Sequence, residues 1–103
     1  MRIKYLYIPK LLNMHMVMDK IFISNQIKLE ILRIGGQPTH KAYNLPGNLT
    51  LDLFSYAQNE ELCRVLEQKL QEIASQYQTG KIILSGDVSK HHTVNECIKM
   101  VFA

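Results

Sequence analysis

Cysteine is scarce in this chain, which carries only Cys63 and Cys97 among its 103 residues. Two cysteines do not make the disulfide framework on which small secreted proteins depend. Each falls on the apolar side of a predicted helix, so we expect two buried thiols, and a single bridge between the helices is the alternative. This usage fits a reducing compartment, and we expect the protein in the cytoplasm.

Long hydrophobic runs are also missing. The chain starts with basic and apolar residues, as a signal peptide does, but Pro9 and several polar residues interrupt the run and no small-residue cleavage site follows. We therefore expect no membrane partner. Met14, Met16 and Met18 lie just before Asp19, so residues 1–17 are a candidate upstream extension of a single domain, residues 1–103.

Runs of one charge, internal repeats and low-complexity segments are absent as well. The net charge of +3 hides an asymmetry, because residues 1–51 carry seven basic and two acidic groups while residues 52–103 carry five basic and seven acidic groups. A basic half is one feature of nucleic-acid-binding proteins. Here the basic residues are spread out and do not alternate with aromatic ones, so nucleic-acid binding is an alternative that we do not favour.

Alternation of apolar and polar residues predicts strands in the first half of the chain. Residues 2–8 alternate until Pro9, and residues 27–34 alternate strictly after a short apolar strand at 21–23 and a turn at 24–26. A loop follows the two glycines at 35 and 36, and residues 49–53 form a fourth predicted strand.

The second half predicts a helix, a strand and a helix. Residues 59–78 carry one apolar helical stripe, with Gly80 as the stop. Residues 81–85 form a fifth, apolar strand. Thr93 and Glu96 have the spacing of a capping box, so the last helix is expected to begin near Thr93.

The resulting order, β-β-β-β-α-β-α, predicts an α+β fold. We expect a two-layer sandwich in which a four- or five-stranded mixed sheet carries both helices on one face. An uncovered sheet face or a free edge strand invites self-association. We therefore expect a homodimer.

The stretch from Asn48 to Ala103 resembles the periplasmic domain of the ExbD/TolR proteins in its order of elements. A short strand, a long amphipathic helix, an apolar strand ending in aspartate and a final helix bearing Val94 and Ile98 carry this resemblance. It implies that Asp87 corresponds to the aspartate that precedes the last helix in that family. The chain departs from the family in lacking a transmembrane helix and in the spacing from Asp87 to Val94, so we assign no family.

The turn at residues 85–92 is the predicted site, because ligands of α/β proteins bind where strands end and helices begin. Backbone N–H groups after Gly86, the start of the last helix and Lys90 would together stabilise a phosphate. The anion-binding candidates are Ser85, Gly86, Asp87, Ser89, Lys90, His91 and His92.

Two alternatives apply to the same turn. A metal site would use Asp87, His91 and His92, but adjacent histidines diverge, and His15 or His40 would have to complete the ligand set. In the other alternative, Asp87 and Ser89 bond the amides of the turn while the histidines are exposed. We expect no metal and no cofactor.

Catalytic signatures are weak elsewhere in the chain. Glu67 and Lys69 have the spacing of a nuclease motif with Asp52 upstream, but residues two apart diverge on a helix. No nucleophile elbow surrounds a serine or cysteine. We therefore expect a binding or regulatory module that acts through protein–protein interaction with an unidentified partner, and more readily a non-enzyme than an enzyme. A small enzyme or ligand-binding domain that uses residues 85–92 is the alternative.

Overall fold

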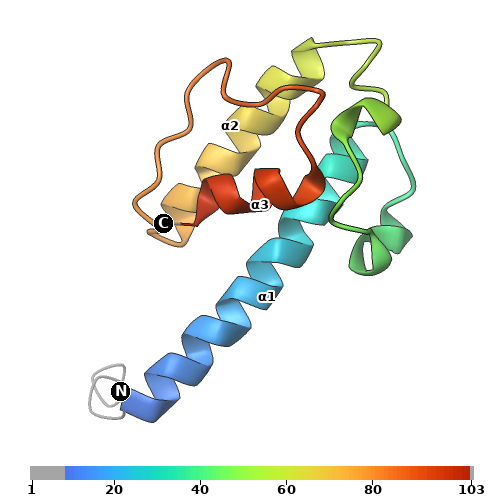
Figure 1. Cartoon of the computed structure of the whole chain (residues 1–103). Coiled ribbons are helices and arrows are strands. Elements are labelled where there is room, and N and C mark those ends of the chain that lie inside the picture. Colours follow the sequence, from blue (N-terminus) through green and yellow to red (C-terminus); the bar gives the residue numbers. More distant parts are fainter. Residues whose placement is uncertain (1–8, 103) are drawn as a thin grey trace.

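Helices make up the regular structure of this chain. The computed structural model describes residues 9–102, with side chains from Lys20 onward (Figure 1). It contains α1 (Pro9–Ile34), α2 (Glu61–Gln76) and α3 (Val94–Val101), and the 3₁₀ helices η2 (Thr39–Asn44) and η3 (Leu51–Leu53). No strand or sheet forms within residues 9–102. The predicted α+β sandwich is therefore wrong.

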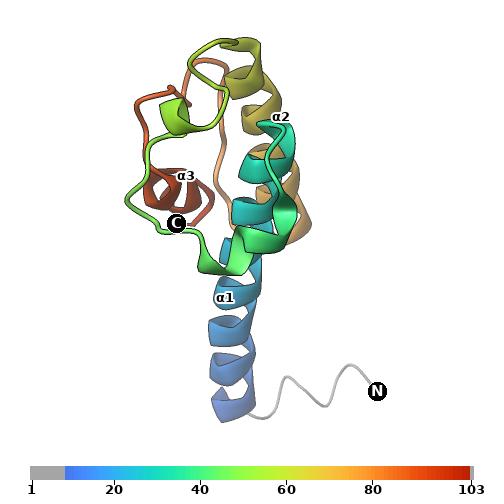
Figure 2. The ribbon, with the colours of Figure 1, turned by 90° about the vertical axis from the view of Figure 1, so that its right-hand side faces the viewer.

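The long helix α1 organises the molecule. Its second half packs against η2, α2 and α3, whereas its first half extends past them without a neighbouring element (Figures 1 and 2). We call residues 9–22 the stem and residues 23–102 the body.

Residues 21–34 lie in α1 instead of forming two strands and a turn. Ile23, Ile27 and Ile31 are each at most 2% exposed, and their spacing of four residues places them on one helical face. Ile27 and Ile31 are an even number of residues apart, so they fit a strand as well as a helix, and the alternation could not separate the two. The first predicted strand, residues 2–8, lies outside the described residues.

The predicted strand at residues 49–53 is replaced by local contacts. Thr50 forms an isolated antiparallel bridge with Thr93, after which the chain turns into η3. The Leu51 N–H donates to the His92 carbonyl and the Val94 N–H to the Leu49 carbonyl, both at 2.9 Å. These bonds tie residues 49–51 to the start of α3 without building a sheet.

Residues 81–85 alternate as a strand does but have no neighbouring strand in the described structure. Ile83 is buried, whereas Ile82 and Leu84 are 70% and 62% exposed. The resemblance to the ExbD/TolR domain required strands at both 49–53 and 81–85. It loses its basis because neither strand forms.

The two helices predicted in the second half are confirmed. α2 lies within the predicted range and buries Leu66, Leu70 and Ile73 on one face. α3 begins directly after Thr93, whose hydroxyl accepts from the Glu96 N–H at 3.1 Å while the Glu96 carboxylate accepts from the Thr93 N–H at 2.8 Å. This capping box fixes the start of α3.

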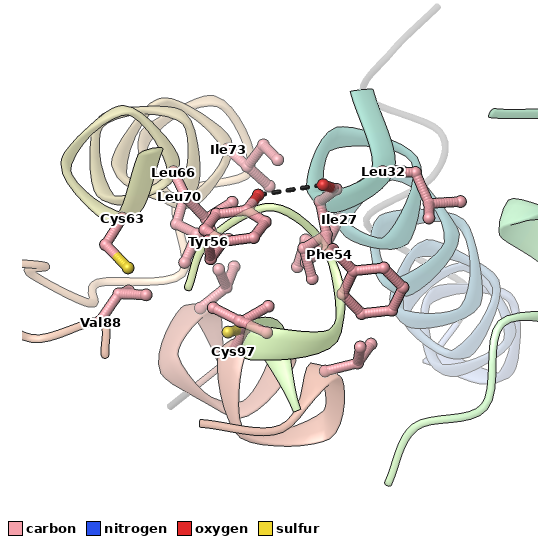
Figure 3. Close-up of a cluster of buried hydrophobic side chains, with 14 of the residues drawn as sticks. Ile27, Leu32, Phe54, Tyr56, Cys63, Leu66, Leu70, Ile73, Val88 and Cys97 are labelled. Atoms are coloured by element: carbon pink, nitrogen blue, oxygen red, sulfur yellow. Dashed lines mark hydrogen bonds between the residues drawn. The ribbon is translucent and has the colours of Figure 1, made fainter. Parts of the chain in front are cut away.

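A buried tyrosine joins the helices at the centre of the core. Tyr56 has no exposed surface, and its hydroxyl donates to the Ile31 carbonyl of α1 at 3.0 Å (Figure 3). Cys63 and Cys97 are also buried and carry free thiols, as the sequence predicts. Burial raises the pKa of both thiols, that of Cys97 to about 12.

Candidate functional site

The predicted site lies in the segment that leads from the end of α2 to the start of α3. Ser85, Gly86, Asp87 and His91 are exposed, and Ser89, Lys90 and His92 are partly buried. Gly86 has a φ of 99°, a backbone conformation that favours glycine. This conformation lets the chain reverse within a few residues.

Side chains of this segment bond its own backbone. The Asp87 carboxylate accepts from the Leu84 N–H at 2.8 Å, and the Ser89 hydroxyl accepts from the His91 N–H at 3.0 Å. The His92 Nδ1 accepts from the Ser89 N–H at 2.9 Å, so Nδ1 carries no proton in this arrangement. These bonds fix the shape of the turn.

The structure does not bring the histidines of the turn together around one point. His91 Nδ1 lies 4.0 Å from a carboxylate oxygen of Asp52, whereas His92 faces its own turn. His40 lies in η2, and the side chain of His15 is outside the described part. Among the described residues, no three histidine, cysteine or carboxylate side chains are grouped so that they could hold a metal ion.

The backbone amides of the predicted anion site, those of Gly86 and Val88, donate hydrogen bonds to Glu67 of α2. Its side chain is only 4% exposed, and one carboxylate oxygen, Oε2, accepts from the Gly86 N–H at 2.9 Å and the Val88 N–H at 2.8 Å. The other oxygen, Oε1, lies 3.0 Å from Arg64 Nε. The backbone therefore presents an anion-binding arrangement to a carboxylate of the same chain. Binding of an anion from solution stays a prediction.

Two further side chains of α2 hold the same segment. Arg64 Nη2 donates to the Val88 carbonyl at 2.6 Å. Gln71 accepts from the Ile83 N–H at 2.7 Å and donates to the Lys81 carbonyl at 3.3 Å. We call Arg64, Glu67 and Gln71 the α2 clamp. It gives residues 81–88 the hydrogen bonds that a neighbouring strand would have supplied.

The sequence contains one signal for Glu67 besides its spacing from Lys69. Glu67 lies on the apolar stripe of α2, because its neighbours on the same helical face are buried. These neighbours are Cys63, Leu66 and Leu70. A carboxylate in such a position needs buried donors, because an unpaired buried charge is costly. The nuclease hypothesis considered Glu67 for its spacing from Lys69, not for its place on this stripe.

A hollow of about 330 Å³ lies beside the α2 clamp. It is lined by Arg64, Glu67, Gln68, Gln71, Ile83 and Ser85. These side chains offer hydrogen-bond donors and acceptors but no histidine or cysteine. The hollow is thus equipped to bind a polar group.

A second candidate surface lies where the stem leaves the body. Ile21 and Phe22 are 60% and 58% exposed. The Phe22 ring meets Tyr77 edge-on, with 6.5 Å between the ring centroids, and Lys20 Nζ lies 5.8 Å from the centroid of Phe102. The residues that directly follow α2 and α3 therefore contact the base of the stem.

No family model, curated protein or solved structure matches the chain. Among the described residues, no helix combines the length and the apolar character that crossing a membrane requires.

Proposed function

We propose that this protein is a small interaction module that binds a partner protein through its stem. The observation that carries the proposal is the course of α1, which continues past the body while Ile21 and Phe22 remain more than half exposed at the point of exit (Figures 1 and 2). The sequence favours the same class of function, a binding or regulatory module.

The first half of α1 has no neighbouring element in the described structure, so a partner would supply the packing that the body does not give it (Figures 1 and 2). Tertiary packing supplies most of the stability of helices in proteins. Burial of a large apolar side chain contributes about 1.5–3 kcal/mol. Ile21 and Phe22 therefore supply a driving force for docking the base of the stem into an apolar groove of a partner.

The base of the stem is suited to transmitting the position of a bound partner to the body. Phe22 contacts Tyr77 at the end of α2, and the Tyr77 hydroxyl donates to Gln26 Oε1 at 3.3 Å. A partner on the stem would thus have a fixed orientation relative to α2.

The homodimer remains a candidate form of this interaction. An uncovered sheet face was one reason to expect it, and that reason disappears because the described residues form no sheet. The exposed Ile21 and Phe22 at the base of the stem take its place as the reason for self-association. We place the protein in a reducing cytoplasm, which the buried thiols of Cys63 and Cys97 support.

Two variants, compared with the wild type, test the proposal. The full chain with a C-terminal affinity tag is purified from its native cells as wild type, as Ile21→Glu/Phe22→Glu and as Leu53→Glu, the last being a control at a site 63% exposed on the body. We expect one protein, identified by mass spectrometry, to accompany the wild type and the control but not the double variant. A partner retained by all three, or by none, contradicts the proposal.

A further inference from the structure

We propose that the Gly86 N–H, the Val88 N–H and the Arg64 guanidinium form a phosphate-binding nest, which the Glu67 carboxylate fills until a phosphate group displaces it. The proposal is independent of the stem and of its partner. It concerns the same turn that the sequence singles out, and it adds the two α2 side chains that complete the site.

The donors of the nest surround the Glu67 carboxylate. The two amides approach one oxygen of Glu67 at 2.9 and 2.8 Å, and Arg64 Nε lies 3.0 Å from the other oxygen. Backbone N–H groups in a turn form concave anion sites, and an arginine beside them adds a positive charge and, in Nε, a further donor.

Glu67 leaves one of these donors unsatisfied. Arg64 Nε is buried, and although Oε1 lies 3.0 Å away, the N–H is not aligned with it, so Nε has no hydrogen-bond partner among the described residues. A carboxylate has two oxygens, and here Oε2 serves both amides. A phosphate group has at least three terminal oxygens, so it can serve both amides and Arg64 Nε together.

The neighbouring hollow provides space for a phosphate to replace the Glu67 carboxylate. Its volume of about 330 Å³ is bordered by Glu67 itself, by Arg64 and by the exposed Ser85. This volume is at the lower end of small-molecule sites. The opening therefore has room for an incoming phosphate beside the displaced Glu67 side chain.

Removal of the internal competitor is the central test. Two-dimensional amide NMR spectra are recorded for the full chain and for Glu67→Ala while sodium phosphate replaces sodium chloride at constant ionic strength. We expect saturable shifts of the Gly86 and Val88 amides in both proteins, with a dissociation constant at least about tenfold lower in Glu67→Ala, since a hydrogen-bonded carboxylate no longer competes.

Two further variants make the result specific. Arg64→Met should abolish the saturable shifts in the otherwise unaltered chain. Glu72→Ala, which removes an exposed carboxylate paired with Lys69 on the same helix, should bind as the wild type does. Phosphoserine is titrated in parallel: equal binding identifies a phosphate monoester as the ligand, and binding of inorganic phosphate alone identifies the free ion.

Three results would overturn the nest. They are the absence of saturable shifts at Gly86 and Val88 in the wild type, tighter binding by the wild type than by Glu67→Ala, and unchanged binding by Arg64→Met. The wild-type and Arg64→Met titrations decide the question even where Glu67→Ala does not fold.

Discussion

Burial of Cys97 makes the free energy of unfolding depend on pH. The thiol has no exposed surface, and desolvation, followed by the nearby Cys63, raises its pKa from the ordinary 9.0 to about 12. In the unfolded chain the thiol ionises near its ordinary value. The unfolded state therefore binds fewer protons than the folded state between about pH 9 and 12, and the free energy of unfolding falls as the pH rises through this window.

The prediction is that Cys97→Ala loses less stability than the wild type on going from pH 7 to pH 10. Urea unfolding at the two pH values measures the difference. The packing lost with the sulfur is the same at both pH values and cancels in the comparison. An equal pH dependence in the two proteins would show that Cys97 is not protected from ionisation by the fold.

Gln78 adopts a left-handed backbone conformation, which is unfavourable for glutamine. α2 ends at Gln76, and Gln78 takes a φ of 54° while the Thr79 N–H donates to the Ala74 carbonyl at 3.0 Å. This bond pattern is a Schellman motif, in which glycine usually holds the left-handed position. The sequence assigned the stop to Gly80, two residues too late.

We expect Gln78→Gly to stabilise the protein by about 1 kcal/mol, because glycine removes the steric cost of the left-handed conformation. Thermal and urea unfolding measure the change. Gln76→Gly, inside the last turn of α2, is the matched control and should destabilise. Loss of stability in both variants would contradict the assignment of the cap to Gln78.

At the scale of elements, the α2 clamp decides the course of residues 81–88. The Glu67 carboxylate is bonded by two amides and lies against Arg64, while Gln71 bonds two backbone groups of the same segment. We predict that Glu67→Ala destabilises the fold by about 2–4 kcal/mol, since the buried Val88 amide and the Gly86 amide lose their acceptor and Arg64 loses its ion-pair partner. Urea unfolding tests this, with Glu72→Ala expected within about 0.5 kcal/mol of the wild type. Equal effects of the two substitutions would contradict the clamp.

The elements that the sequence could predict are those with local signals. α2 has an unambiguous apolar stripe, and α3 has both a stripe and the Thr93–Glu96 capping box, so their residues alone determine them. α1 lacks such a signal. Its isoleucines at 27 and 31 fit both periods, and packing of that face against the body selects the helix.

The candidate site was predictable only in part, for a related reason. The turn at 85–92 follows from its glycine and polar residues, but its hydrogen-bond partners lie on α2, about 20 residues earlier in the chain. Residues 81–85 are predicted to form a strand because they include an apolar run, and in the structure only Ile83 of that run faces the core. Whether their backbone pairs with a strand or with Gln71 depends on the tertiary structure, which an apolar run does not report.

At the scale of the whole molecule, we expect the body to provide the stability of the fold and the stem to bind the partner. Ile27 lies in the core with no exposed surface, whereas Ile21 and Phe22 lie outside it. We predict that Ile21→Glu/Phe22→Glu melts within a few degrees of the wild type, because substitutions at exposed sites change stability by about 0.5 kcal/mol each. Ile27→Glu, on the same helix, should unfold the protein. A large loss of stability in the double variant would show that the base of the stem belongs to the core.

Site-specific photocrosslinking tests the role of the stem most directly. A photoreactive amino acid replaces Ile21 in one protein and Leu53 in another, both positions being about 60% exposed, and the cells are irradiated before lysis. The account predicts a discrete protein adduct from position 21, either a second copy or another chain, and none from position 53. Lipid adducts, no adduct from position 21, or the same adduct from both positions would contradict it.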